Sequence, residues 1–286
     1  MPELPEVAAL VEFLDARASG RRAARVDVAS VQVLKTYDPP PSALHGRGLT
    51  SVSRHGKFLA LDFDGLHFVA HLARAGWLHW RDALPAAPLR PGKSPIALRM
   101  AFDDGAGFDL TEAGTKKRLA AYVVEDVDDV PGVAALGVDP LSQDFTVAAL
   151  TELLSGRRTQ IKGVLRDQKL LAGVGNAYSD EVLHAAKASP FKLASAFDGD
   201  DTAQLHEAIT TTLAEAVERS RGLAAKQLKA HKRENLRVHG RAGQACGVCG
   251  DVIREVSFAD SALQYCPTCQ TGGKLLADRR LSRLLK

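Results

Sequence analysis

Long hydrophobic runs are missing from this chain of 286 residues. No apolar stretch approaches the roughly 20 residues that a transmembrane helix needs. The first residues include acids early and show neither the basic start nor the apolar core of a secretory signal. Internal repeats and low-complexity tracts are also missing. These absences exclude membrane-spanning and repeat architectures, so we expect a globular protein of the cytoplasm.

The composition fits that class, with 45% hydrophobic and 25% charged residues. The length suits one large domain or two domains of ordinary size. The net charge of +3 conceals an uneven distribution of charge. Residues 221–286 contain 13 Lys or Arg and 5 Asp or Glu, whereas the preceding 220 residues contain 24 basic and 29 acidic residues. A basic final quarter indicates a polyanionic partner such as nucleic acid, although a solvated basic tail has the same composition.

Cysteine is missing from the first 245 residues and then occurs four times, as two Cys-x2-Cys pairs separated by 16 residues. Two such pairs on tight turns can close a tetrahedral zinc site. Two disulfides in a secreted protein are the alternative, which no signal sequence supports. Because thiolates would fill all four positions, the predicted zinc is structural rather than catalytic. The predicted ligands are Cys246, Cys249, Cys266 and Cys269.

Hydrophobic periodicity changes along the chain. Apolar residues repeat at helical spacing from Leu4 to Leu14, and this helix is expected to end before Ser19-Gly20. Alternating strand patterns follow, with a hairpin turn at Asp64-Gly65. Helical patterns dominate from about residue 140 to 222, before a basic linker and the cysteine hairpin. We predict an α+β protein of two domains: a helix on an antiparallel β-sandwich, then a helical domain ending in a zinc-finger hairpin.

Two short segments have chemistry of their own. In "GVGNAYSDE" the glycines permit a tight turn, and Asn176 is predicted to cap a helix whose first N–H groups can hold a phosphate. An ordinary glycine turn that binds no phosphate is the alternative interpretation of this segment. Lys57 in "RHGKF" begins a strand, where it can touch phosphates or be a solvated charge. The "PGKS" at 91–94 is not a phosphate loop, because Ala87 stands where that motif requires glycine.

Four separated motifs share one resemblance. The "MPELPEV" start, the "GKFL" strand, "GVGNAYSDE" and the cysteine pattern ending in "CQ" resemble the formamidopyrimidine-DNA glycosylase/endonuclease VIII family over nearly the whole chain. The resemblance implies a β-sandwich domain joined to a helix–two-turn–helix domain with a zinc finger, and double-stranded DNA bound between them. It implies excision of oxidised bases and cleavage of the abasic strand by a monomer at the bacterial nucleoid. The implied segments are residues 1–135, 136–238, 239–272 and a basic extension, 273–286.

The resemblance also implies roles for single residues. Pro2 corresponds to the nucleophile once Met1 is removed, because an α-amino group with a pKa of about 8 is partly unprotonated at neutral pH. Its attack on C1′ of deoxyribose gives an iminium ion, the electron sink that elimination needs. Glu3 corresponds to the general acid/base, with Glu6 in support, and Lys57 to a phosphate contact that assists β-elimination. The implied DNA-binding residues are Arg74, Lys93, Arg118, Arg157 and Asn176.

The chain departs from the family pattern in its void-filling loops. The family's "HLGMSG" is "HLARAG" here, so Arg74 stands at the residue that fills the gap left by a flipped base. The loop "DPRRFG" is replaced by "TEAGTKKRLAAY", in which Lys117, Arg118 and Leu119 are candidate void fillers. We therefore expect side chains other than those of the family to fill the gap left by the flipped base.

Three further departures concern the carboxy-terminal part. Ser261 replaces an Arg that assists the second elimination, which leaves β- and β,δ-elimination both open. The segment 221–241 is short for a loop that encloses 8-oxoguanine, which argues against that lesion as the preferred substrate. The final "TGGKLLADRRLSRLLK" can supply phosphate contacts or be a solvated helix.

Three functions follow from these patterns. The first is a bifunctional DNA glycosylase and abasic-site lyase. A non-catalytic binder of damaged or abasic DNA on the same scaffold is the alternative. The third, a zinc-ribbon adaptor for RNA or protein, leaves "MPELPEV" and "GVGNAYSDE" unexplained.

Overall fold

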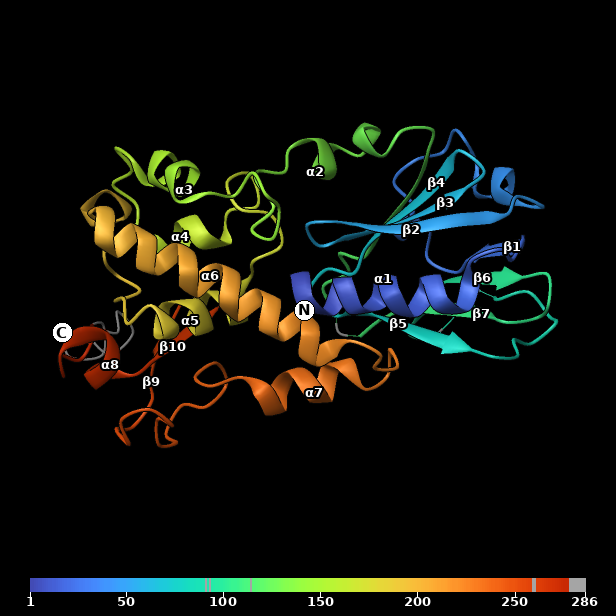
Figure 1. Cartoon of the computed structure of the whole chain (residues 1–286). Helices are drawn as coiled ribbons and strands as arrows, with labels where there is room; N and C mark the ends of the chain where they lie inside the picture. The colour runs from blue at the N-terminus through green and yellow to red at the C-terminus, as the bar shows by residue number, and fades with distance from the viewer. Residues whose placement is uncertain (91, 93, 114, 259–260, 278–286) are drawn as a thin grey trace. The chain divides into compact units, whose positions relative to one another are not determined.

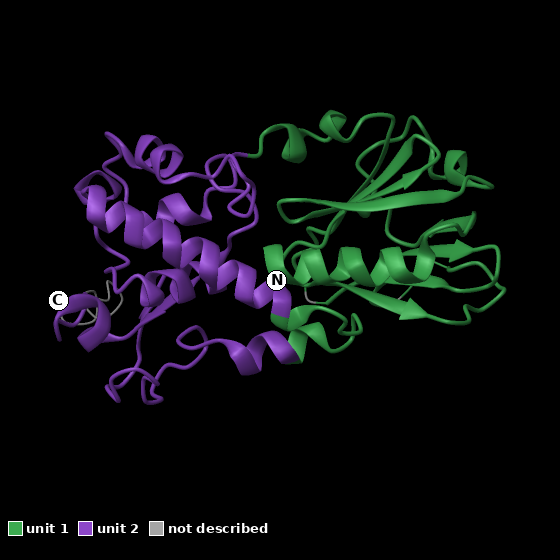
Figure 2. Ribbon diagram, viewed as in Figure 1, with its two compact units in different colours: residues 1–136, 219–230 green, residues 137–218, 231–286 purple. Residues whose placement is uncertain are grey.

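The computed structural model describes residues 1–90, 92, 94–113, 115–258 and 261–277 (Figure 1). The chain forms two compact units, coloured separately in Figure 2. Unit 1 contains residues 1–136 and 219–230, and unit 2 contains residues 137–218 together with those from 231 onward. The predicted fold class is confirmed in both units: a helix on an antiparallel β-sandwich in unit 1, and helices with a cysteine-bearing hairpin in unit 2. The predicted domain boundaries stay predictions.

Unit 1 is built from helix α1, strands β1 to β8 and short helical turns. Its strands form two antiparallel sheets, with the orders β1-β6-β7-β5 and β2-β3-β4-β8. The elements are α1 Leu4–Ala18, β1 Ala23–Val28, η1 Val31–Val33, η2 Pro41–Leu44, β2 Leu49–His55, β3 Phe58–Phe63, β4 Leu66–His71, β5 Gly76–Arg81, β6 Ile96–Phe102, β7 Gly107–Glu112, β8 Ala120–Val124, η3 Val127–Asp129 and α2 Pro131–Ala134.

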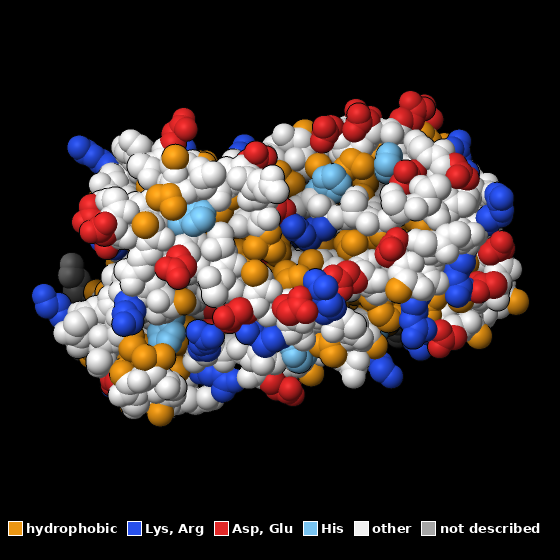
Figure 3. Space-filling model, in the orientation of Figure 1, with side chains coloured by type: hydrophobic (Ala, Val, Ile, Leu, Met, Phe, Trp, Pro, Cys, Tyr) orange, Lys and Arg blue, Asp and Glu red, His pale blue; other side chains and the backbone are white. Residues whose placement is uncertain are grey.

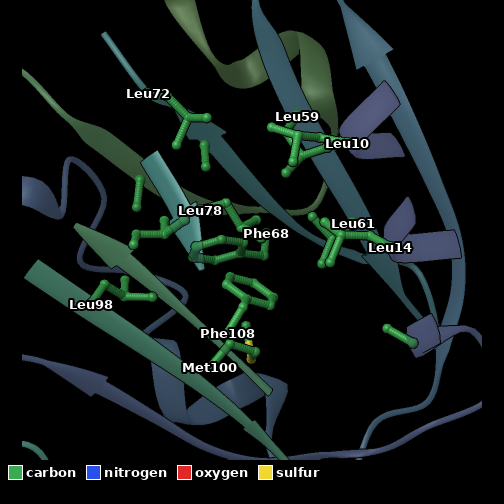
Figure 4. Close-up of a cluster of buried hydrophobic side chains, with 14 of the residues drawn as sticks. Leu10, Leu14, Leu59, Leu61, Phe68, Leu72, Leu78, Leu98, Met100 and Phe108 are labelled. Carbon is green, nitrogen blue, oxygen red and sulfur yellow. The ribbon is translucent and has the colours of Figure 1, made fainter. Parts of the chain in front are cut away.

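The core of unit 1 lies between α1 and the two sheets. Leu10 and Leu14 of α1 point into it, beside strand residues from both sheets such as Phe68 and Phe108 (Figure 4). All four side chains are completely buried. Removing each large side chain of this kind from water contributes roughly 1.5–3 kcal/mol, so the core fixes α1 on the sandwich.

Local sequence explains the two hairpin turns of the sheet β2-β3-β4-β8. The β3–β4 turn is Asp64-Gly65, as predicted, and both residues have positive φ, 49° and 81°. Such a turn matches the twist of a two-residue hairpin. The β2–β3 turn is Gly56-Lys57, where Gly56 has a φ of 55°. The second turn positions Lys57.

Unit 2 is mainly helical and carries the cysteine hairpin. Its elements are α3 Val147–Leu154, α4 Ile161–Arg166, α5 Asn176–Ala185, η4 Ala194–Ala196, α6 Gly199–Ser220, the later part of α7 Leu228–Asn235, β9 Arg254–Ser257, β10 Ala262–Tyr265 and α8 Pro267–Thr271. Strands β9 and β10 pair antiparallel. Among the described residues, none of the helices combines the length and the apolar character that crossing a bilayer requires.

The segment expected to be a basic linker differs from that expectation, because it contains α7. Ala225 and Leu228 are buried in the unit 1 core, and the Trp77 indole N–H donates to the Ala225 carbonyl at 3.1 Å. Burial of these apolar side chains therefore stabilises regular structure in a segment whose many charged residues suggested a linker.

Candidate functional site

The first residues of the chain form the start of α1. Pro2 is buried, Glu3 is 2% exposed and Glu6 is 1% exposed. The Glu6 carboxylate accepts a hydrogen bond from the Glu3 backbone N–H at 2.8 Å, and the two glutamates form a capping box. The capping box satisfies backbone donors that the first helical turn leaves without intrahelical partners. Glu6 therefore fixes the backbone that carries Pro2 and Glu3.

Lys57 is buried rather than solvated. It is 7% exposed in the β2–β3 turn, which rules out the interpretation as a solvated surface charge. His71 at the end of β4 pairs with Phe58, and their rings lie 4.7 Å apart between centroids. Burial, reinforced by the positive charge of Lys57, lowers the pKa of His71 to about 4. A neutral imidazole therefore accompanies the Lys57 ammonium at neutral pH.

Arg74 lies exposed in the turn between β4 and β5. The turn is closed by the Gly76 N–H, which donates to the Leu72 carbonyl at 2.9 Å. A Cβ on Gly76 would stand 2.1 Å from that carbonyl oxygen and 2.9 Å from the Leu119 side chain. Only glycine fits there, so the "HLARAG" turn is a tightly defined platform for Arg74.

Glu112 holds the segment that replaces the family's second void-filling loop. Its buried Oε1 accepts from the backbone N–H groups of Arg118, at 2.6 Å, and Leu119, at 2.9 Å. The expectation that Leu119 fills the void is wrong, because its side chain is 1% exposed and belongs to the unit 1 core. Lys117 and Arg118 are exposed. Lys93, another predicted DNA contact, lies outside the described residues.

Asn176 opens α5, but it is not the N-cap that the sequence predicted. The cap position belongs to Gly175, and Asn176 is the first helical residue. The Asn176 side-chain Nδ2 donates to the Ala262 carbonyl of β10 at 2.8 Å. The turn before it depends on Gly173, with a φ of 91°, whose N–H donates to the Gln168 side chain at 3.0 Å. The cap prediction failed because the side chain is used by β10 instead.

The remaining predicted DNA contacts lie at exposed positions. Arg157 is exposed between α3 and α4, and its Nε donates to the Leu153 carbonyl at 2.6 Å. Further exposed cations follow α6 and accompany α7: Arg221, Lys226, Lys229, Arg233 and Arg237. On the face shown in Figure 3, blue basic and red acidic side chains are interspersed. Individually placed cations, rather than one continuous basic surface on that face, are therefore available to phosphates.

Sequence reasoning missed two adjacent buried carboxylates on α5. Asp180 is 1% exposed and Glu181 is 4% exposed. Asp180 pairs with Lys162 of α4 and with His239, which follows α7. One signal of their burial is present in "NAYSDEVL", where the two acids are followed directly by Val182 and Leu183. The helix that carries them is buried at most of its residues, so acids within it are buried too. The partners are 18 and 59 residues away in sequence, so no local pattern identifies them.

The cysteine cluster is confirmed. One Sγ atom from each of the four cysteines lies within 4.8 Å of all the others. A tetrahedral zinc with Zn–S bonds of about 2.3 Å needs sulfur atoms roughly 4 Å apart, so the donor set fits a structural Zn²⁺. Burial raises the pKa of the metal-free Cys266 thiol to about 11. Zinc reverses this preference, because a coordinating thiol is deprotonated outright.

His184 at the end of α5 supports the cluster. Its Nε2 lies 3.3 Å from the Cys246 Sγ, and the residue is 4% exposed. Because a thiolate only accepts, Nε2 carries the hydrogen, and burial lowers the pKa of this imidazole. Such an N–H donor orients a metal-bound thiolate.

Ser261, where the family has an Arg, accepts the Phe258 N–H through its carbonyl at 2.7 Å.

Known proteins match this arrangement along almost the whole chain. Residues 1–118 match the formamidopyrimidine-DNA glycosylase N-terminal domain, and residues 136–227 match the formamidopyrimidine-DNA glycosylase H2TH domain. Residues 243–272 match the zinc finger found in formamidopyrimidine-DNA glycosylase and isoleucyl-tRNA synthetase. The three matches follow one another in the order of the structural elements.

Curated and solved relatives agree with these matches. A formamidopyrimidine-DNA glycosylase of Symbiobacterium thermophilum is 35% identical over 98% of this chain and 93% of its own length. An uncharacterized formamidopyrimidine-DNA glycosylase-like protein of Mycobacterium tuberculosis is 57% identical over 54% of this chain and 98% of its own length. The Lactococcus lactis formamidopyrimidine-DNA glycosylase, solved non-covalently bound to DNA with an abasic site, has a TM-score of 0.82, 26% identity and coverage of 94% of this chain and 99% of its own.

A helix-capped β-sandwich, a helix–two-turn–helix region and a four-cysteine zinc finger in one chain define a base-excision-repair DNA glycosylase. The chain belongs to the formamidopyrimidine-DNA glycosylase family. The zinc is structural, and the DNA glycosylase and abasic-site lyase activities are those of this family.

Proposed function

We propose that this chain removes oxidised bases from double-stranded DNA and nicks the strand through the amine of Pro2. The observation that carries the proposal is the buried Pro2-Glu3 pair, held at the start of α1 by the Glu6 carboxylate. In the chain as translated, the Pro2 nitrogen is a tertiary amide. Removal of Met1, which is 47% exposed, converts it to a secondary amine. We therefore propose that the protein works at the bacterial nucleoid.

The first half of the reaction exchanges one C–N bond for another. The Pro2 nitrogen lone pair attacks C1′ of the damaged nucleotide, the bond from C1′ to the base breaks, and the departing base takes up the proton that the amine loses. Glu3 supplies a proton as the sugar ring opens, so that O4′ becomes a hydroxyl and C1′ becomes a positively charged iminium carbon. The base must leave the helical stack before this attack can occur.

The second half uses the iminium ion as an electron sink. A base removes a proton from C2′, the electrons form the C1′–C2′ enamine, and the C3′–O bond to phosphate breaks. Water then hydrolyses the conjugated iminium and releases Pro2. We assign the proton transfers to Glu3 and the phosphate contact beside C3′ to Lys57, whose burial strengthens its interaction with an anion.

The other predicted residues are proposed to hold the DNA. Asn176 supplies an amide N–H to a phosphate oxygen, and Arg157 a cation to the backbone. Arg74 and Arg118 stand in exposed turns whose backbones are fixed by Gly76 and Glu112, and they are proposed to fill the void left by the extruded base. The zinc bound by the four cysteines holds the β9–β10 hairpin, whose β10 strand contacts Asn176.

Glu3→Gln tests the chemistry against the alternative of a non-catalytic binder. We expect incision of duplexes with oxidised bases to fall by about 10²- to 10⁴-fold, the typical contribution of a positioned acid/base. Binding to a duplex with a stable abasic-site analogue should stay within a few-fold. Product ends resolved on a sequencing gel measure incision and separate β- from β,δ-elimination.

Glu12→Gln is the matched control, since Glu12 lies on the same helix with its side chain 43% exposed. It should cut at the wild-type rate. Tight binding to abasic DNA with no incision by the chain lacking Met1, across a panel of lesions, would instead establish the non-catalytic binder.

A further inference from the structure

Two charges are buried side by side on α5. Asp180 and Glu181 are 1% and 4% exposed. A buried carboxylate costs several kcal/mol unless charged or N–H partners surround it. Both acids have such partners, and all of them come from other segments of unit 2.

Asp180 receives three donors from three segments. Its Oδ1 accepts from the Lys162 Nζ of α4 at 2.5 Å, and its Oδ2 accepts from the His239 Nδ1 at 2.7 Å. The same Oδ2 lies 3.2 Å from the backbone N–H of Gln264 on β10. One carboxylate therefore ties α5 to α4, to the chain that follows α7 and to the zinc hairpin.

Glu181 binds the chain that leads into the first zinc knuckle. Its carboxylate accepts from three successive backbone N–H groups, those of Arg237, Val238 and His239, at 2.6, 2.9 and 2.8 Å. Successive N–H groups that converge in this way form an anion-binding nest. Burial raises the pKa of Glu181, and these three hydrogen bonds oppose that rise.

Asn176 is attached to the same network at both its backbone and its side chain. Its carbonyl accepts from the Lys162 Nζ at 3.1 Å, and its Nδ2 donates to the Ala262 carbonyl of β10 at 2.8 Å. Ala262 stands two residues from Gln264, which Asp180 holds. An amide nitrogen has two N–H donors, so the bond to Ala262 fixes the direction of the second one.

We propose that Asp180 is a positioning residue that sets the Asn176 amide for binding a DNA phosphate. Through Lys162 it holds the Asn176 backbone, and through Gln264 it holds the strand that orients the Asn176 side chain. His239 completes the pairing of the buried charge. The inference rests on the proposed phosphate contact of Asn176, and it adds that the contact depends on a charge network behind it.

A double-mutant cycle between Asp180 and Asn176 tests the proposal. The measured quantity is the Kd for a duplex that contains a tetrahydrofuran abasic-site analogue, with the zinc-loaded full chain. Asn176→Ala should raise Kd by about tenfold, the loss expected for a hydrogen bond to a charged group. Asp180→Asn should raise Kd by a similar factor, and the double variant should be no weaker than about twice either single variant.

Leu205→Ala is the control for general destabilisation. Leu205 of α6 is fully buried and makes no contact with the network among the hydrogen bonds and ion pairs of the described residues. Its effect on Kd should multiply with that of Asn176→Ala. His239→Gln keeps the test open if Asp180→Asn does not fold, because it removes one partly exposed hydrogen bond and should also fail to multiply with Asn176→Ala.

Two results overturn the proposal, and they differ in what else they reject. Multiplying effects of Asp180→Asn, or of His239→Gln, with Asn176→Ala show that Asp180 serves folding alone, and they leave the proposed function intact. An unchanged Kd in Asn176→Ala removes the phosphate contact itself, so the role of Asn176 in the proposed function fails together with the inference.

Discussion

Two glutamates at the start of α1 stand one helical turn apart and hold the same backbone. The Glu6 carboxylate accepts the Glu3 backbone N–H, and the Glu3 carboxylate accepts the Glu6 backbone N–H to complete the capping box. Both hydrogen bonds satisfy donors that the helix start leaves without intrahelical partners. Glu3 adjoins Pro2 and is the carboxyl group that we propose for proton transfer, with Glu6 in support.

At the same scale, the lowered pKa of His71 predicts that the protein becomes less stable in acid. Burial and the Lys57 charge lower its pKa in the folded chain to about 4, whereas an unfolded histidine has a pKa of about 6.5. Between these values the unfolded state binds more protons, so the free energy of unfolding falls as the pH falls from 6.5 toward 4. The contribution of this one group is on the order of 3 kcal/mol.

Urea unfolding at several pH values between 7 and 4 measures this term in wild type and in His71→Gln. Other groups titrate in both proteins, so the difference between the two curves isolates His71. The variant should be the less stable protein at pH 7 and should lose part of that deficit as the pH falls. A difference that stays constant with pH would show that His71 does not stay neutral in the folded state.

At the scale of elements, the zinc hairpin is too small to stabilise itself. Strands β9 and β10 have 4 residues each, and two short strands are marginal in water. Zinc adds stability to the two small hydrophobic clusters of this region. The hairpin in turn contacts Asn176 and Asp180 through β10. Through the proposed phosphate contact of Asn176, the zinc hairpin would then contribute to DNA binding.

Removal of zinc by a chelator should therefore weaken binding to the abasic-site duplex by at least tenfold while unit 1 stays folded. Both tryptophans, Trp77 and Trp80, lie on β5 of unit 1, so their fluorescence reports on that unit alone. We expect affinity to fall with little change in tryptophan emission, and to return when Zn²⁺ is added. Full affinity without zinc would separate the hairpin from DNA binding.

Local patterns predicted those elements whose stability is local. The α1 helix, the Asp64-Gly65 hairpin and the cysteine cluster each depend on neighbouring letters, and each was predicted. Helix α7 was missed because apolar contacts of Ala225 and Leu228 with distant core residues outweigh its charged sequence. The burial of Leu119 was missed for the same reason, since its side chain packs in the unit 1 core beside Gly76 of β5. Asp180 is bonded to residues as far as 84 positions away in sequence, which no periodicity detects.

At the scale of the whole molecule, the chain passes between its two units three times, at residues 136–137, 218–219 and 230–231. The proposed nucleophile belongs to unit 1, whereas Asn176, Arg157 and the zinc belong to unit 2. The return of residues 219–230 to unit 1, anchored on Trp77, gives the units more than one covalent connection. The residues proposed for catalysis and part of those proposed for DNA binding therefore lie in different compact units of one polypeptide.

The central claim is that the Pro2 amine, freed by removal of Met1, is the nucleophile. Borohydride reduction during reaction with abasic-site DNA converts an iminium ion into a stable amine, and peptide mass analysis then locates the attached sugar. The account predicts a covalent adduct on a chain that begins at Pro2, with the added mass on the amino-terminal peptide. An adduct on Lys57 or another lysine, or an undiminished adduct in Pro2→Gly, would contradict it.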